Sequence, residues 1–262
     1  MFQPVVISSG IAGWQFLQAT YDRQVKSFNT SAELKRDTDY FEQEIENVRT
    51  AEELVSDRRL LTVALGAFGL EDDINNTYFI KKMLEEGTTA EDSLANRFTD
   101  ERYKDFSAAF GFGPTEIPGN LRESFAEEIT AKFQAQRFEA AVGEQNESMR
   151  IALYAERSLN ETVGEDVSEN AKWFSIMGQP PLRSLFETAL GLPQGFGQAD
   201  IDQQLSVFKD RASAIFGSDD PAIFLEDEIR EDLINKYLAR SQINEFGSLN
   251  SSASIALTLL QT

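Results

Sequence analysis

The chain has 262 residues, of which 41% are hydrophobic and 11% aromatic, and its formal net charge is −20. This hydrophobic content excludes a chain that is disordered throughout and predicts a globular protein. The excess of 44 acidic over 24 basic residues argues against nucleic acid and anionic lipid as partners, because both are bound through clustered Lys and Arg.

Cysteine and histidine are both absent from the sequence. Their absence removes disulfides, thiolate nucleophiles, the usual zinc sites and the side chain that titrates near neutral pH. A carboxylate-dependent hydrolase or a magnesium site built from Asp and Glu remains open. We therefore favour a non-enzymatic protein and predict no catalytic residue, no cofactor and no metal site.

The N-terminal segment MFQPVVISSGIAGWQFLQATYDRQ lacks a charged region before its apolar residues, and polar residues soon interrupt them. This pattern predicts neither a cleavable signal peptide nor a membrane span. We expect a cytoplasmic protein, or one exported by a route that uses an uncleaved N-terminus.

Helix signals recur along the chain, whereas alternating strand patterns do not. The first helix is predicted to begin near Ser9, because apolar residues follow at steps of three or four: Ile11, Trp14, Leu17, Tyr21, Val25 and Phe28. Further helix starts are indicated by capping-box spacings at Thr30–Glu33, Thr50–Glu53, Thr88–Glu91 and, in a looser form, Asn120–Glu123. The fold class is therefore all-α, a compact multi-helix bundle.

The segment DRRLLTVALGAFGLEDDINN, residues 57–76, contains two glycines but no phosphate-binding loop, because neither glycine is followed by Lys-Ser or Lys-Thr. It predicts a buried helix that ends at a left-handed Gly69, with Leu70 as the hydrophobic contact just beyond. EDDINN lacks the central glycine and the closing Glu of a calcium-binding loop.

The segment GFGPTEIPGN, residues 111–120, predicts a linker, and residues 160–170 predict an exposed connection.

The motifs at 58–70 and 103–111 recur in order at 182–193 and 208–217, which either marks a diverged duplication or is chance. The expected organisation is an N-terminal amphipathic helix over 1–29, two helical lobes over 30–115 and 120–246, and a charge-poor tail over 247–262. The glycines of 191–198 predict a turn, and the acids of 224–240 a solvated helix face.

The two ends of the chain are unusual in so acidic a protein. The first helix is rich in aromatic residues, and the last fifteen residues carry no charge. Either these ends dock on the core, or they contact another copy or another protein. The candidate partner-binding residues are Trp14, Phe16, Leu17, Tyr21, Ile255, Leu257 and Leu260.

Residues 40–113 resemble a bacterial domain of unknown function associated with flagellar gene clusters, through DRRLL, ALGAFGL, DINN, FIKKMLEEG and AFGFG. The resemblance implies a helical domain and a role in flagellar assembly, the basal body or the axial structure, through flagellar proteins or self-association. Residues 9–28 and 248–262 are also similar in character to the terminal helices of flagellar axial proteins. The alternatives are a cytoplasmic export chaperone or adaptor and a carboxylate- or magnesium-dependent hydrolase.

Overall fold

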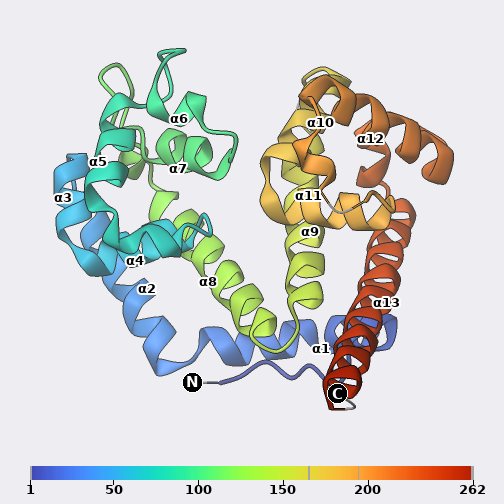
Figure 1. Cartoon of the computed structure of the whole chain (residues 1–262). Helices are drawn as coiled ribbons and strands as arrows, with labels where there is room; N and C mark the ends of the chain where they lie inside the picture. Colours follow the sequence, from blue (N-terminus) through green and yellow to red (C-terminus); the bar gives the residue numbers. More distant parts are fainter. Residues whose placement is uncertain (1, 165, 194, 261–262) are drawn as a thin grey trace. The chain divides into compact units, whose positions relative to one another are not determined.

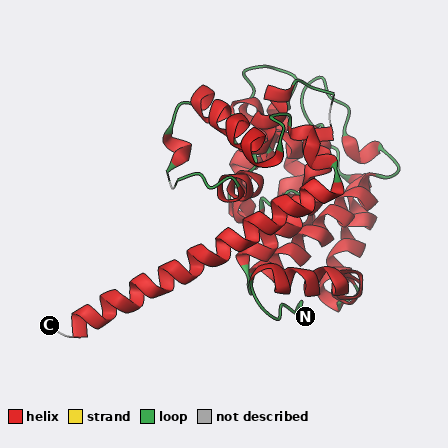
Figure 2. Cartoon of the chain, turned by 90° about the vertical axis from the view of Figure 1, so that its right-hand side faces the viewer, coloured by secondary structure: helices red, strands yellow, loops and turns green. Residues whose placement is uncertain are grey.

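The computed structural model describes residues 2–164, 166–193 and 195–260, and from residue 246 onward it gives the backbone only. Within these ranges the regular elements are thirteen α-helices and five short 3₁₀ helices, with no β-strand (Figure 1, Figure 2). The prediction of an all-α protein is confirmed.

The chain divides into two compact units. Unit 1 is built mainly from Thr20–Ala141, and unit 2 from Val6–Ala19 and the chain from Val142 onward. The division therefore falls within a helix and not in the segment 111–120, where the two lobes were expected to meet. The first helix contributes its first half to unit 2 and its second half to unit 1.

Unit 1 contains the second half of α1 (Gly10–Asn29), α2 (Ala32–Glu44), η1 (Ile45–Asn47), α3 (Ala51–Ser56), α4 (Arg58–Gly66), η2 (Glu71–Asn75), α5 (Thr77–Glu86), α6 (Leu94–Arg97), α7 (Arg102–Phe110), η3 (Gly119–Leu121) and most of α8 (Phe125–Gly143). Helix α2 packs on α4, and α3 packs on both α4 and α5. A chain of edge-on or tilted rings fills the core, with centroids 5.6 Å apart for Phe68–Phe106, 5.0 Å for Phe106–Phe110 and 5.2 Å for Phe110–Phe125. Such aromatic pairs add to the free energy gained by burying their surface.

Unit 2 contains the first half of α1, α9 (Glu147–Gly164), α10 (Glu169–Gly178), α11 (Pro180–Ala189), η4 (Phe196–Gln198), α12 (Ile201–Phe216), η5 (Pro221–Leu225) and α13 (Asp227–Leu260). Helix α11 packs against α9, α10 and α13. Trp173 is fully buried, its ring lies 5.6 Å from those of Phe186 and Phe208, and its indole nitrogen donates to the carbonyl of Asp219. With 34 residues, α13 is ~50 Å long. Figure 2 shows its last turns running past the other helices of unit 2.

Two of the predicted helix ends form as expected. Thr50 and Glu53 make a complete capping box, in which each side chain accepts a hydrogen bond from the other residue's backbone N–H at 3.2 Å. Gly69 has a φ of +67°, and the N–H of Leu70 donates to the carbonyl of Leu65 at 3.0 Å, which satisfies the end of α4.

The three other predicted capping boxes do not form, because their side chains have different partners. The hydroxyl of Thr30 donates back to carbonyls of α1, and that of Thr88 donates to Glu116. The amide of Asn120 donates to the carbonyls of Ile45 and Val48.

The segment predicted to be a linker and the first part of the predicted connection 160–170 belong to the packed structure, whereas residues 166–168 are an exposed connection between α9 and α10. Residues 111–120 lie within unit 1, where Glu116 accepts from the backbone of Thr88 at 2.6 Å and of Gly113 at 3.3 Å. Residues 160–164 continue α9, and Thr162 is buried and accepts from the side chain of Gln179 at 3.0 Å.

The internal sequence echo has a partial structural counterpart. Helices α7 and α12 both end at left-handed glycines, Gly111 and Gly217. The sequence comparison also pairs Gly66 with Gly191, yet only Gly191 has a positive φ. In unit 1 the left-handed glycine that follows the helix is Gly69, three residues after Gly66. The repeated sequence motif therefore ends in the same type of turn in both units, but at positions that do not align.

Candidate functional site

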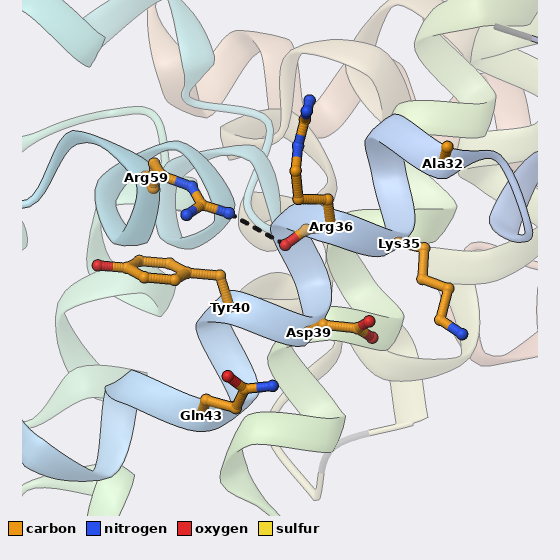
Figure 3. Close-up of a pocket in the computed structure, with 7 residues that line it drawn as sticks. All are labelled: Ala32, Lys35, Arg36, Asp39, Tyr40, Gln43 and Arg59. Carbon is orange, nitrogen blue, oxygen red and sulfur yellow. Dashed lines mark hydrogen bonds between the residues drawn. The ribbon is translucent and has the colours of Figure 1, made fainter.

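Helix α2 presents one apolar face and one charged face. Leu34, Thr38 and Phe41 are buried at helical spacing, because this face packs against the core of unit 1. The opposite face combines with the start of α4 to form a shallow, open pocket of about 470 Å³ (Figure 3). Its lining residues are Ala32, Lys35, Arg36, Asp39, Tyr40, Gln43 and Arg59.

Asp57 fixes the position of α4 relative to Tyr40. One carboxylate oxygen of Asp57 caps α4 by accepting from the backbone N–H of Arg59 at 2.9 Å and of Leu60 at 3.1 Å. The other oxygen accepts from the Tyr40 hydroxyl at 2.6 Å. A single carboxylate therefore links the two helices that form the pocket.

The same contacts shift two pKa values. Burial by itself would raise the pKa of Asp57, but the hydrogen bonds from Tyr40, Leu60 and Arg59 outweigh it, and the net pKa lies below the ordinary aspartate value. The hydrogen bond to Asp57 raises the pKa of Tyr40 above its usual range. At neutral pH the carboxylate of Asp57 is therefore ionised and lies beside the protonated phenol of Tyr40, which lines the pocket.

Arg59 is held in a defined orientation at one side of the pocket. Its guanidinium carbon lies 3.8 Å from the centroid of the Tyr40 ring, a cation–π arrangement. It also donates to the backbone carbonyl of Arg36 at 3.1 Å, the dashed line in Figure 3, and lies 3.9 Å from the carboxylate of Asp37. Stacking and hydrogen bonding together restrict the guanidinium rotamers before any ligand is present.

The remaining charges of the pocket are exposed. Within the described part of the chain, the side chains of Lys35, Arg36 and Asp39 have no hydrogen-bond or ion-pair partner. The pocket thus combines three cations with one carboxylate, in a chain whose net charge is −20. Guanidinium and ammonium groups in such a setting bind carboxylates and other oxyanions.

The structure offers no assembled metal site in the ranges it describes, since no three or more Asp or Glu side chains converge there. No described helix combines the length and apolarity that crossing a bilayer requires.

The N-terminal candidates lie on α1, and two of them are buried. Trp14 is 4% exposed and Leu17 fully buried, both in unit 2, whereas Phe16 and Tyr21 are partly exposed. The Tyr21 ring packs edge-on against Phe138, with centroids 5.5 Å apart. The first half of α1 therefore docks on the core of its own chain.

The C-terminal candidates lie on α13. The backbone of Ile255, Leu257 and Leu260 is helical, and their side chains lie outside the described residues. Helix α13 approaches the start of α1 closely at Gln242. A Cβ added at Gly10 would stand only 2.5 Å from the side-chain oxygen of Gln242.

Sequence reasoning missed the pocket on α2. The signal was present, because Ala32, Lys35, Arg36, Asp39 and Gln43 recur at helical spacing opposite the apolar positions of the same helix. The contribution of Arg59 could not be read from that spacing, since it depends on how α4 packs on α2.

The described residues thus define an all-α protein of two helical units with an ionic surface pocket on unit 1. Residues 67–224 match the family described as "Protein of unknown function (DUF1217)", and the chain belongs to this family. The pocket residues precede the matched segment.

Comparison with solved structures shows the same fold in a second protein. The X-ray crystal structure of protein AGR_C_984 from Agrobacterium tumefaciens superposes with a TM-score of 0.74. The two sequences are 21% identical, and the match covers 89% of this chain and 93% of the other. The search of curated proteins returned no match.

Proposed function

We propose that this protein is a non-enzymatic component of bacterial flagellar assembly, or of the basal body or axial structure, and that it acts through contacts with other proteins. One observation carries the proposal. The backbone of α13 stays helical through Leu260, while the sequence after Glu245 contains no charged residue in a chain of net charge −20.

The composition of this segment is suited to packing against another helix. A helix without charges has no ion pairs along its surface, and its apolar residues gain free energy only when they are covered. Partner recognition by one apolar helix face in a groove or bundle is a recurrent mode of binding. The flagellar part of the proposal is supported by the resemblance over residues 40–113 and by the similar character of the chain ends to those of axial proteins.

The two chain ends support the proposal unequally. Trp14 and Leu17 are buried in unit 2, so they are not available to a partner without rearrangement of that unit. The proposal therefore places the main partner contact in residues 248–262.

The test is an in-frame deletion of the gene in its source bacterium, scored by swimming in soft agar and by electron microscopy of the cell surface. We expect filaments or hooks to be lost. The full gene should restore them, and a copy lacking residues 248–262 should not.

Two matched double variants test whether the apolar side chains of this segment are required, or only the presence of the segment. Leu257→Asp with Leu260→Asp adds two charges at apolar positions and should fail to restore swimming. Ser251→Asp with Ser254→Asp adds the same charge at polar positions and should restore it. Normal flagella in the deletion strain would overturn the proposal.

Cellular location distinguishes a structural component from an export chaperone or adaptor. A component of the basal body or axial structure is recovered in purified basal bodies, whereas a chaperone remains in the cytoplasmic fraction with its client. Immunoblots of the two fractions from the complemented strain make this distinction.

A further inference from the structure

We propose that the charged face of α2 binds the same face of a second copy of this chain, with the two α2 helices antiparallel. The carrying observation is the order of charges along this face. Arg36 and Asp39 lie one helical turn apart, both are exposed, and neither side chain has a partner in the described part of the chain.

The pattern is self-complementary under a two-fold axis. When two antiparallel α2 helices cross midway between positions 36 and 39, each Arg36 lies opposite the Asp39 of the other copy, and two equivalent ion pairs form. The same register sets each Lys35 opposite a Tyr40 and each Ala32 opposite a Gln43, so that the two Arg36–Asp39 pairs supply the charge complementarity of the contact.

Tyr40 and Arg59 suit the centre of such a contact. Arg and Tyr are among the residue types enriched where interfaces bury their energetically important contacts. The Arg59 guanidinium is already stacked at 3.8 Å on Tyr40 and bonded to the Arg36 carbonyl, and Tyr40 is bonded to Asp57. Little side-chain freedom remains to be lost when a second copy covers this pair.

The mixed charge of the pocket favours a second copy over other occupants. A purely acidic partner would face Asp39, and a purely basic one would face the three cations. The pocket is open, whereas small-molecule sites are mostly enclosed. At about 0.15 M salt, repulsion between the two acidic chains is largely screened beyond ~8 Å, so the local charges decide the contact.

Sedimentation velocity over a concentration series at about 0.15 M salt tests this contact. The wild-type chain should show a reversible monomer–dimer equilibrium. Arg36→Glu places two carboxylates opposite each other, and Asp39→Arg places two guanidinium groups opposite each other. Each variant alone should dimerise at least about tenfold more weakly than wild type, because like charges at a contact repel.

Mixing the two variants is the decisive measurement. An Arg36→Glu chain carries acids at both positions, and an Asp39→Arg chain carries bases at both. A one-to-one mixture should therefore form heterodimers at concentrations where each variant alone is largely monomeric. The double variant Arg36→Asp with Asp39→Arg restores complementarity within one chain and should dimerise again.

Matched controls are available on α1 of the same unit. Lys26→Glu and Asp22→Arg make the same charge changes at exposed positions four residues apart, and they should leave dimerisation unchanged. Circular dichroism of each variant verifies that its helix content is retained.

A wild-type chain that remains monomeric up to its solubility limit would overturn the proposal. So would a dimer that survives both single substitutions, or variants that do not associate when mixed. The contact does not depend on the flagellar role, so its failure would leave the deletion experiment and its interpretation unaffected.

Discussion

The side-chain amide of Asn120 lies 2.7 Å from the carbonyl oxygen of Ile45, a residue 75 positions earlier in the chain. It donates equally closely to the carbonyl of Val48 and is 2% exposed. Asn120 thereby adds a second donor to two backbone carbonyls, one at the first residue and one at the C-cap of the 3₁₀ helix that follows α2. The segment before α8 is thereby attached to the 3₁₀ helix η1, which directly follows α2.

Replacing Asn120 should therefore destabilise unit 1. We expect Asn120→Ala to lower the free energy of unfolding by about 1–2 kcal/mol, because two carbonyls each lose one of their two hydrogen-bond donors. Urea unfolding followed by circular dichroism measures the change. Asn47→Ala, which removes one long hydrogen bond at an exposed site, is the control and should cost less than about 0.5 kcal/mol. Equal losses for the two variants would contradict this role of Asn120.

The carboxylate of Glu116 should make stability depend on pH. Burial by itself would raise the pKa of Glu116, but hydrogen bonds from Thr88, Gly113 and Thr89 outweigh it, and the net pKa is below the ordinary value of 4.5. A lowered folded-state pKa means that the contribution is present above pH 4.5 and is lost as the pH falls through the folded pKa.

We expect Glu116→Gln to lower the free energy of unfolding at pH 7 by about 1–2 kcal/mol, because charge-assisted hydrogen bonds are weakened. The difference from wild type should shrink as the pH is lowered below 4.5. Urea midpoints of both proteins, measured from pH 7 down to pH 3, test this, and a difference that is independent of pH would refute it.

Tyr103 should ionise late in an alkaline titration. Burial and the hydrogen bond to Asp73, at 2.6 Å, raise the pKa of Tyr103 to about 12. Because the folded state favours the protonated phenol, this contribution to stability is present below pH 10 and is lost as the pH rises towards 12. Absorbance of tyrosinate near 295 nm should show the late step in wild type. Tyr103→Phe should reduce the amplitude of that step, whereas Tyr78→Phe, at an exposed position, should leave it unchanged.

The two glycines that end α7 and α12 should differ in tolerance to substitution. Both have a positive φ, so either Gly→Ala change introduces backbone strain of about 1 kcal/mol. A Cβ at Gly111 would also stand 2.5 Å from the backbone carbonyl of Ile117, whereas nothing lies within 4 Å of one at Gly217. We expect Gly111→Ala to cost about 1–3 kcal/mol more than Gly217→Ala in urea unfolding. If the two variants lost a similar free energy of unfolding, the backbone at Ile117 would have to shift away from the new Cβ at little cost, which would contradict this prediction.

Much of the fold follows from local sequence signals. Helical spacing of apolar residues predicted the all-α class and the start of the first helix near Ser9, and α1 begins at Gly10. The Thr50–Glu53 box and the left-handed Gly69 were also correct, because the partners of each lie within a few residues. The flagellar role and the partner-binding residues of the tail stay predictions.

Competition from distant partners explains two of the three capping boxes that failed. Thr88 and Asn120 have sequence contexts typical of helix starts, yet Thr88 bonds to Glu116 and Asn120 to Ile45 and Val48. The Pro- and Gly-rich segment 111–120 was predicted to be a linker, and these two contacts are what hold it in unit 1.

Local propensity therefore decided where most helices form, and tertiary packing decided which polar side chains meet. The cations Lys35 and Arg36 share a face of α2 by helical spacing alone. Arg59 joins them only because Asp57 caps α4 and at the same time bonds Tyr40. Contacts within a few residues are encoded by spacing, whereas contacts between helices depend on how apolar faces pack, and that packing has no local signature in the sequence.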